Sequence, residues 1–542
     1  MKIENPILRG FHPDPSIIRV GEDYFIATST FEWWPGVRIH HSKDLKNWEL
    51  LPYPLCRKSQ LDLTGVGDSQ GIWAPCLTWH NDTFYLVYTV VTSFYCNMQD
   101  THNYLVTAQD IRGPWSEPIA LNNFGFDPSL FHDEDGKKYI VSMVTDHRVP
   151  QKYSGRLLLQ EYDDKQKKMV GEIKDIYTGQ HGYLEGPHIF KRNQYYYLFT
   201  ADHGTGEEHG QSMLRSENIW GPYEWNEKNS ILTSRNNPER ILQKAGHADL
   251  VQSQNGEWYI VHLCGRALDN TNPADSKKLP GKRRYPLGRE TALQKVIWTE
   301  DDWLELNNKT ILPESVINID GQNEYPLEKS KEIDNFDEDE LSLEYQSLRK
   351  PLDNFNFSLT ERPGYLRLFG RDGLSSRHDQ SLIARRWTEF RFEASTKLEF
   401  EPQNFKQMAG LVCMYDVENF YYLHITYDED IGKCISIFTS RNKVCNMTGE
   451  MFSVENNIPV YLKVTVSFDV LQFYYSYDNV QYIKIGPELD ASALSDEACA
   501  NGWFTGAMVG ICCQDMSGSG VFADFDWFGY HKMRNDNYEQ KL

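Results

Sequence analysis

The segment Phe126-Asp-Pro-Ser-Leu-Phe-His-Asp-Glu-Asp-Gly-Lys-Lys-Tyr-Ile-Val-Ser142 contains the pattern from which the fold can be predicted. An aspartate beside a proline is followed by a short apolar run, a polar turn and an aromatic strand. The turn, residues 133–136, has the acidic and glycine residues that β-hairpins favour between their strands. The segment therefore predicts a β-hairpin that begins at the Asp-Pro pair.

The same pattern occurs five times in the first 300 residues. The other copies begin with Pro13-Asp-Pro-Ser-Ile-Ile18, Trp73-Ala-Pro-Cys-Leu77, Leu184-Glu-Gly-Pro-His-Ile189 and Gly246-His-Ala-Asp-Leu-Val251. With residues 14, 73, 127, 185 and 247 as markers, the spacings are 59, 54, 58 and 62. Segments such as His41-Ser-Lys-Asp-Leu-Lys-Asn-Trp48 add further strands. This period predicts a five-bladed β-propeller, whereas a β-sandwich would space its strands irregularly and a (β/α)₈ barrel would need amphipathic helices.

The five markers predict a functional site at one end of the propeller. The first strand of each blade lines the central channel, so the markers should meet at one mouth: Asp14, Trp73, Asp127, Glu185 and His247. A single Asp-Pro-Ser is more often a turn. Three carboxylates at equivalent positions of a repeat are different, because like charges repel in a partly desolvated site.

The repeat ends near residue 305, and a second domain is expected after it. The acidic stretch 328–340 predicts a solvated linker. Strands with alternating apolar residues follow, such as 420–426, 434–438 and 460–468. The fold class is therefore all-β, with a propeller of residues 1–320 and a β-sandwich of residues 321–542.

Composition excludes several classes of partner. The chain has 542 residues, with 55 Lys and Arg against 77 Asp and Glu, a net charge of −22. An anionic nucleic acid or membrane surface would repel it. No apolar run has the length of a membrane span, and no secretory leader is visible, so a cytoplasmic location is expected. The ten cysteines are scattered and predict reduced thiols without a zinc site.

Several segments resemble the motifs of glycoside hydrolase family 43: Phe11-His-Pro-Asp-Pro-Ser16, Phe126-Asp-Pro-Ser-Leu-Phe131 and Glu185-Gly-Pro-His188. Others are similar to its β-xylosidase branch: Thr28-Ser-Thr-Phe-Glu-Trp-Trp-Pro-Gly-Val-Arg-Ile-His-His-Ser42, Phe504-Thr-Gly-Ala-Met-Val-Gly510 and Cys513-Gln-Asp515. The resemblance implies a five-bladed propeller followed by a concanavalin-like, or lectin-like, sandwich. It also implies hydrolysis of glycosides with inversion of the anomeric configuration.

The resemblance implies a role for each polar residue. Asp14 would be the general base that activates water, and Glu185 the general acid that protonates the departing oxygen. Asp127 resembles a third carboxylate, which orients the acid and keeps its pKa raised by repulsion. Arg289 resembles the arginine that donates hydrogen bonds to the innermost sugar. A surface ion pair with Glu290 is the alternative for Arg289.

The aromatic residues and a histidine complete the expected pocket. Trp73 and Phe31 would lie along the faces of the sugar, and Phe504, from the sandwich, would close the pocket mouth. His247 resembles a channel histidine that in some members contacts a water-ligated calcium ion. A buried core histidine is the alternative for His247. Hydrolysis itself requires no cofactor, so calcium in the channel is the one metal that the resemblance brings in.

The resulting hypothesis is an exo-acting β-xylosidase that removes D-xylose from the non-reducing ends of β-1,4-xylooligosaccharides. An α-L-arabinofuranosidase, or an enzyme with both activities, is the alternative. A non-catalytic sugar-binding propeller would have no reason to gather three carboxylates. A WD-type interaction propeller would show a shorter repeat. The expected partner is a small oligosaccharide, and a homo-oligomer, either a dimer or a tetramer, is also expected.

Overall fold

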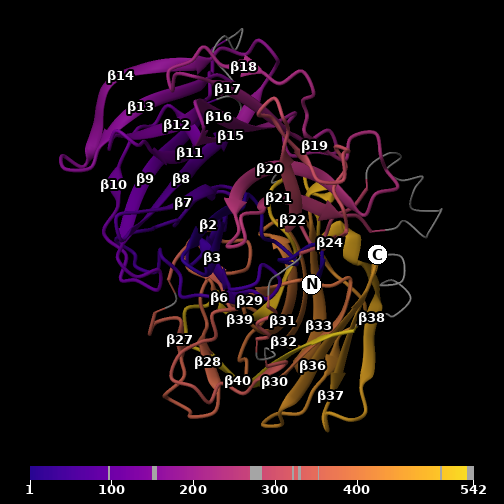
Figure 1. The fold of residues 1–542 in the computed structure, drawn as a ribbon. Coiled ribbons are helices and arrows are strands. Elements are labelled where there is room, and N and C mark those ends of the chain that lie inside the picture. The colour runs from indigo at the N-terminus through magenta and orange to yellow at the C-terminus, as the bar shows by residue number, and fades with distance from the viewer. Residues whose placement is uncertain are drawn as a thin grey trace.

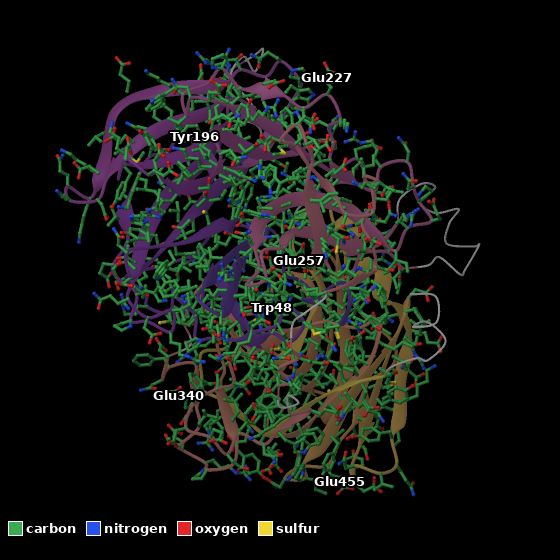
Figure 2. The ribbon with its side chains drawn as sticks, in the orientation of Figure 1. Trp48, Tyr196, Glu227, Glu257, Glu340 and Glu455 are labelled. Atoms are coloured by element: carbon green, nitrogen blue, oxygen red, sulfur yellow. The ribbon has the colours of Figure 1, made fainter. Side chains whose placement is uncertain are left out.

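The computed structural model describes residues 1–95, 98–148, 155–268, 283–319, 323–327, 331–351, 353–500 and 503–533. These residues form strands and two short 3₁₀ helices, η1 (Ala491–Ala493) and η2 (Asp496–Ala498). Figure 1 shows two adjoining bodies, one built from the indigo-to-magenta half of the chain and one from the orange-to-yellow half. Exposed Glu227 and Glu455 mark opposite ends of the molecule in Figure 2. No helix in the described residues has the length and apolar character needed to cross a membrane.

The N-terminal body contains five antiparallel sheets that follow one another along the chain. The first two are β2 (Ser16–Val20), β3 (Asp23–Thr28), β5 (Arg38–Ser42) and β6 (Glu49–Leu50), then β7 (Gly71–His80), β8 (Thr83–Tyr95), β9 (Met98–Ala108) and β10 (Ile119–Ala120). The third is β11 (Gly125–His132), β12 (Lys138–Val144), β13 (Leu157–Asp163) and β14 (Lys168–Tyr177). The fourth is β15 (Leu184–Arg192), β16 (Tyr195–Asp202), β17 (Gly210–Ser216), β18 (Glu224–Trp225) and β19 (Leu232–Thr233). The fifth is β20 (Leu242–Gln252), β21 (Trp258–Arg266), β22 (Glu290–Trp298) and β23 (Leu304–Leu306).

The first strands of these sheets form a closed ring. β2 contacts β7, β7 contacts β11, β11 contacts β15, β15 contacts β20, and β20 contacts β2. The N-terminal strand β1 (Lys2–Glu4) pairs with β24 (Val316–Asn318), and Leu8 bridges to Thr291 in the fifth sheet. The start of the chain is thus fastened beside the last blade. The five-bladed propeller that the repeat predicts is confirmed.

The turn that identified the repeat also forms as predicted. The amide of Asp133 donates to the carbonyl of Lys137 at 2.9 Å, and the amide of Gly136 donates to the carbonyl of Asp133 at 3.0 Å. Gly136 has φ +84°, a conformation that side-chain-bearing residues rarely adopt. This turn lets β11 run back as β12 with an extended ladder between them. Local sequence therefore determines the hairpin of this blade.

The C-terminal body is a β-sandwich of two antiparallel sheets. One contains β25 (Ile333–Asp334), β27 (Phe357–Ser358), β28 (Leu366–Phe369), β30 (Arg391–Glu399), β36 (Val460–Ser467), β37 (Val470–Ser476), β38 (Ile483–Asp490) and β40 (Phe522–Lys532). The other contains β29 (Ser381–Arg386), β31 (Gln407–Asp416), β32 (Asn419–Asp428), β33 (Gly432–Arg441), β34 (Val444–Met447), β35 (Phe452–Ser453) and β39 (Met508–Asp515). In β36, Val460, Leu462, Val464 and Val466 alternate with less buried residues. Apolar residues from both sheets form one core between them.

The two bodies are joined by paired backbone, apolar packing and buried charge. β26 (Ser347–Leu348) pairs with β4 (Trp33–Trp34), which lies in the chain between β3 and β5 of the first blade. One hydrophobic cluster includes residues of the propeller, such as Phe31, and residues of the sandwich, such as Tyr422. Fully buried Arg349 contacts Asp68 at 2.6 Å. The sandwich therefore packs against the propeller through a hydrophobic core that residues of both domains form.

Candidate active site

A pocket of about 190 Å³ lies where the inner strands of the propeller meet the sandwich. Its lining includes every residue that the sequence nominated: Asp14, Phe31, Trp73, Asp127, Glu185, His247, Arg289 and Phe504. Six further residues line it: Phe94, Gln99, Phe126, Tyr183, Gly204 and Thr205. Residues separated by almost 500 positions in the sequence thus form one cavity.

A β-bulge near the start of the inner strands places the carboxyl groups. The ladder skips two residues after Phe126 in the third blade and after Glu185 in the fourth. Asp14 and Asp127, each one residue before a proline, both have φ 53°. In the fourth blade this position, with φ +55°, belongs to Gly186. The bulge turns successive side chains out of the ladder and toward the pocket.

This register corrects one expectation from the sequence. The three carboxylates do not occupy equivalent positions, because Glu185 corresponds to Trp73 and Phe126, one residue earlier than Asp127. The prolines in the sequence could have revealed this offset. Gly186 precedes Pro187 as Asp127 precedes Pro128, so Gly186 and not Glu185 is the equivalent of Asp127. Glycine takes the left-handed position in the fourth blade, so the acidic side chain there comes from the neighbouring residue.

The carboxyl group of Asp14 has a partner on each oxygen. The hydroxyl of Ser29 donates to Oδ2 at 2.7 Å, and Nη1 of Arg289 donates to Oδ1 at 2.7 Å. These charge-assisted hydrogen bonds fix the orientation of a carboxylate. The alternative surface pair for Arg289 is wrong, because Glu290 instead pairs with buried Arg266 at 2.7 Å. Arg289 itself is buried in the pocket wall.

Glu185 and Asp127 are both buried, and their pKa values are raised. Burial, and then the charge of Asp14, raises the pKa of Glu185 to about 7, with Arg289 acting in the opposite direction. Burial, and then Glu185 and Asp14, raises the pKa of Asp127 well above its ordinary value. Asp14 therefore adds to the raised pKa of Glu185, and Glu185 and Asp127 repel each other. Asp127 also accepts a hydrogen bond from the amide of Gly186 at 3.0 Å, which holds the backbone next to Glu185.

Aromatic rings form one wall of the pocket. The ring of Trp73 lies 5.2 Å from Phe504, 5.1 Å from Phe126 and 5.0 Å from Phe94, measured between centroids. Phe31 stacks on Phe504 at 5.8 Å. Such a wall is suited to the C–H faces of an apolar or sugar ring, while the carboxyl groups face its hydroxyls.

Phe504 is held in this wall by contacts with the propeller. Its carbonyl accepts a hydrogen bond from Nη2 of Arg289 at 3.1 Å. Next to it, the backbones of the two domains approach closely: a Cβ on Gly288 would lie 2.6 Å from the carbonyl oxygen of Thr505, and one on Gly506 would lie 2.8 Å from that of Leu287. The absence of side chains at these two glycines lets the sandwich reach the pocket.

His247 lies beside the carboxyl group of Asp14. Its Nδ1 is 3.7 Å from Oδ1 of Asp14, and burial lowers the pKa of His247 to about 4. A neutral imidazole at this point can contact a polar ligand or a water molecule. Throughout the described residues, no group of three or more His, Cys, Asp or Glu side chains could hold a metal ion. A calcium ion held through water at His247 therefore stays a prediction from the resemblance.

Comparisons with known proteins agree with this architecture. Residues 3–304 match the family described as glycosyl hydrolases family 43, and residues 333–531 match the β-xylosidase C-terminal concanavalin A-like domain. The chain is 45% identical to a β-xylosidase of Bacillus subtilis, over 98% of this chain and 99% of that protein. It is also 45% identical to xylosidase/arabinosidase 43B of Humicola insolens, over 99% of each.

A solved structure shows the same fold over the whole chain. The crystal structure of a xylan β-1,4-xylosidase from Bacillus halodurans is 47% identical in sequence and superposes with a TM-score of 0.94. The alignment covers 98% of this chain and 100% of that one. The propeller and its concanavalin-like partner are thus those of a glycoside hydrolase, and the chain belongs to family 43.

Proposed function

We propose that the protein is an inverting exo-β-xylosidase that releases D-xylose from the non-reducing ends of β-1,4-xylooligosaccharides. The observation that carries this proposal is the contrast between two carboxyl groups in one pocket. Asp14 is held by Arg289 and Ser29, which stabilise a carboxylate, whereas the raised pKa of Glu185 favours a protonated acid. Inverting hydrolysis needs one group of each kind.

The proposed reaction gives each of the two carboxyl groups one role. Asp14 removes a proton from a water molecule as that water attacks the anomeric carbon, and Glu185 gives its proton to the oxygen of the departing sugar. The C–O bond to the departing sugar breaks as the bond to water forms on the opposite face. Asp14 then loses its proton to solvent and Glu185 regains one. Arg289 orients the carboxyl group of Asp14 through the hydrogen bond to Oδ1, and Asp127 holds the backbone beside the acid.

The dimensions of the pocket support action at chain ends. Its volume of about 190 Å³ is below the range of about 300 to 1,000 Å³ that is typical of sites for drug-sized ligands. Phe504 stands across one side, held by Arg289. A terminal sugar fits this description better than an internal segment of a long chain does. The homo-oligomeric state and the cytoplasmic location expected from the sequence stay predictions.

A second activity, on α-L-arabinofuranosides, is favoured by one of the relatives, which is named a xylosidase/arabinosidase. Arabinofuranose and xylopyranose can present similar hydroxyl patterns to a pocket. The same Asp14 and Glu185 would serve both substrates, so the second activity needs no additional site.

The stereochemistry of the product tests the proposal directly. We expect purified protein to hydrolyse 4-nitrophenyl β-D-xyloside and xylobiose, and a proton NMR time course should show α-xylose before mutarotation produces the β-anomer. A parallel assay with 4-nitrophenyl α-L-arabinofuranoside measures the second activity. Initial release of β-xylose would contradict inversion, and the absence of hydrolysis of any xyloside would contradict the proposed function.

The pH dependence should follow the ionisation of Glu185. Its pKa is raised to about 7, so the acid is protonated below that pH and loses its proton above it. We therefore expect kcat/KM for xylobiose to be lost as the pH rises through about 7, by roughly tenfold per pH unit beyond it. An ordinary glutamate would already be ionised near pH 5. Undiminished kcat/KM up to pH 9 would contradict the assignment of Glu185 as the acid.

A further inference from the structure

Tyr183 lines the pocket but has no role in the mechanism above. It immediately precedes β15, in which Glu185 is the second residue. Side chains two residues apart in an extended chain project to the same side, so Tyr183 and Glu185 face the pocket while Leu184 between them is fully buried in the core. Tyr183 is therefore a neighbour of Glu185 on the same side of the chain.

The exposure of Tyr183 differs from that of the residues around it. Its side chain is 42% exposed, whereas Glu185 is 9% exposed. A tyrosine that lines a pocket and is also open to solvent stands at the pocket mouth. A ligand that extends out of the pocket past Glu185 would meet this ring.

The hydroxyl of Tyr183 is available to a ligand. Within the described part of the chain it makes no hydrogen bond to protein, in contrast to the nearby hydroxyl of Tyr177, which donates to the carbonyl of Gly182 at 3.1 Å and accepts from the amide of His181 at 2.8 Å. Although the residue as a whole is 42% exposed, its hydroxyl is desolvated in the pocket, and this desolvation, followed by the charges of Glu185 and Asp127, raises the pKa of Tyr183 well above its ordinary value. The hydroxyl thus stays protonated and can act as a donor.

The position of the ring is set by the backbone around it. The hydroxyl of Tyr177 hydrogen-bonds to the backbone of the two residues before Tyr183, His181 and Gly182. Gly155 packs against the ring from the third blade, and a Cβ on Gly155 would lie 2.9 Å from Cδ2 of Tyr183. The ring of Tyr183 therefore lies directly against the backbone at Gly155, where a side chain would not fit. A ring supported in this way can position a ligand.

We propose that Tyr183 positions the leaving sugar, by lying against that sugar's ring and donating a hydrogen bond from its hydroxyl. The inference rests on the proposed function, because the general acid must touch the oxygen of the leaving sugar, which therefore lies on the side of Glu185. The rings of Phe31 and Phe504 lie near Arg289, the partner of Asp14, and so belong to the inner sugar. Tyr183 is a positioning residue for the outer one.

The test compares two substrates that differ only in the leaving group. Xylobiose carries a sugar there, and methyl β-D-xyloside carries a methyl group. For Tyr183→Ala we expect kcat/KM on xylobiose to fall more than about tenfold and kcat/KM on methyl β-D-xyloside to change by less than about twofold. Tyr183→Phe, which keeps the ring, should lose about three- to tenfold on xylobiose, as expected for one hydrogen bond.

The matched control is Tyr477→Ala in the sandwich, since Tyr477 has a similar exposure of 41%. It should leave both substrates unchanged, and thermal unfolding should show that all variants are folded. Equal losses on the two substrates, or no loss on xylobiose, would overturn the role of Tyr183 while the wild-type enzyme remains a β-xylosidase. A wild-type protein that cleaves no xyloside would instead overturn the proposed function, and this inference with it.

Discussion

Replacement of Asp14 by asparagine is expected to lower kcat/KM on every glycoside by about 10⁴-fold. An amide cannot accept a proton from the attacking water, and it also removes the charge that raises the pKa of Glu185. Two changes that oppose catalysis therefore follow from one substitution. The measurement is kcat/KM on both 4-nitrophenyl β-D-xyloside and xylobiose, since loss of the base should affect good and poor leaving groups alike.

Two variants make this result interpretable. Ser29→Ala removes the hydrogen bond to Oδ2 of Asp14 but leaves the carboxylate and Arg289 in place, so we expect a loss of no more than about tenfold. Asp175→Asn, outside the pocket lining, should have no effect. An Asp14→Asn protein that is folded and retains a tenth of the wild-type rate would show that another group is the base.

Replacement of Glu185 by glutamine is expected to give losses that depend on the leaving group. Xylobiose should lose about 10³- to 10⁴-fold, because the departing sugar oxygen needs a proton. A dinitrophenyl β-xyloside, whose leaving group departs as a stable anion, should lose less than about tenfold. The decline in kcat/KM above pH 7 should also disappear in this variant, because the group that causes it is gone.

The control for this second prediction is Glu227→Gln, on the exposed end of the propeller (Figure 2). It should leave both substrates and the pH profile unchanged. If Glu185→Gln reduced kcat/KM for xylobiose and for the dinitrophenyl substrate by the same factor, the proton donor would have to be sought elsewhere in the pocket.

The sequence predicted the propeller because each blade has local signals that recur. Hairpin turns such as that at Gly136 determine neighbouring strands without help from the rest of the chain. The register of the inner strands was predicted wrongly by one residue in the fourth blade, because a β-bulge changes which side chain faces the axis. Alignment on the proline, with Gly186 opposite Asp127, would have found that register.

The residues that line the pocket also differ in whether the sequence could predict them. The eight nominated residues lie in motifs that the sequence repeats or shares with family 43, and all of them line the cavity. Phe94 comes instead from the end of β8 and Gln99 from the start of β9, and Thr205 comes from the turn after β16. These segments extend beyond the repeat by lengths that differ from blade to blade. Their approach to the channel depends on the packing of the complete molecule, for which the sequence alone has no local signal.

The contact of Phe504 with Arg289 has a consequence for biosynthesis. Asp14 is translated long before Phe504, and the segment that carries Phe504 is placed by a sandwich whose strand β40, at residues 522–532, lies between β28 and β30. That sheet cannot be completed until residues 522–532 have left the ribosome. A nascent propeller therefore has its carboxyl groups long before Phe504 closes the pocket beside them.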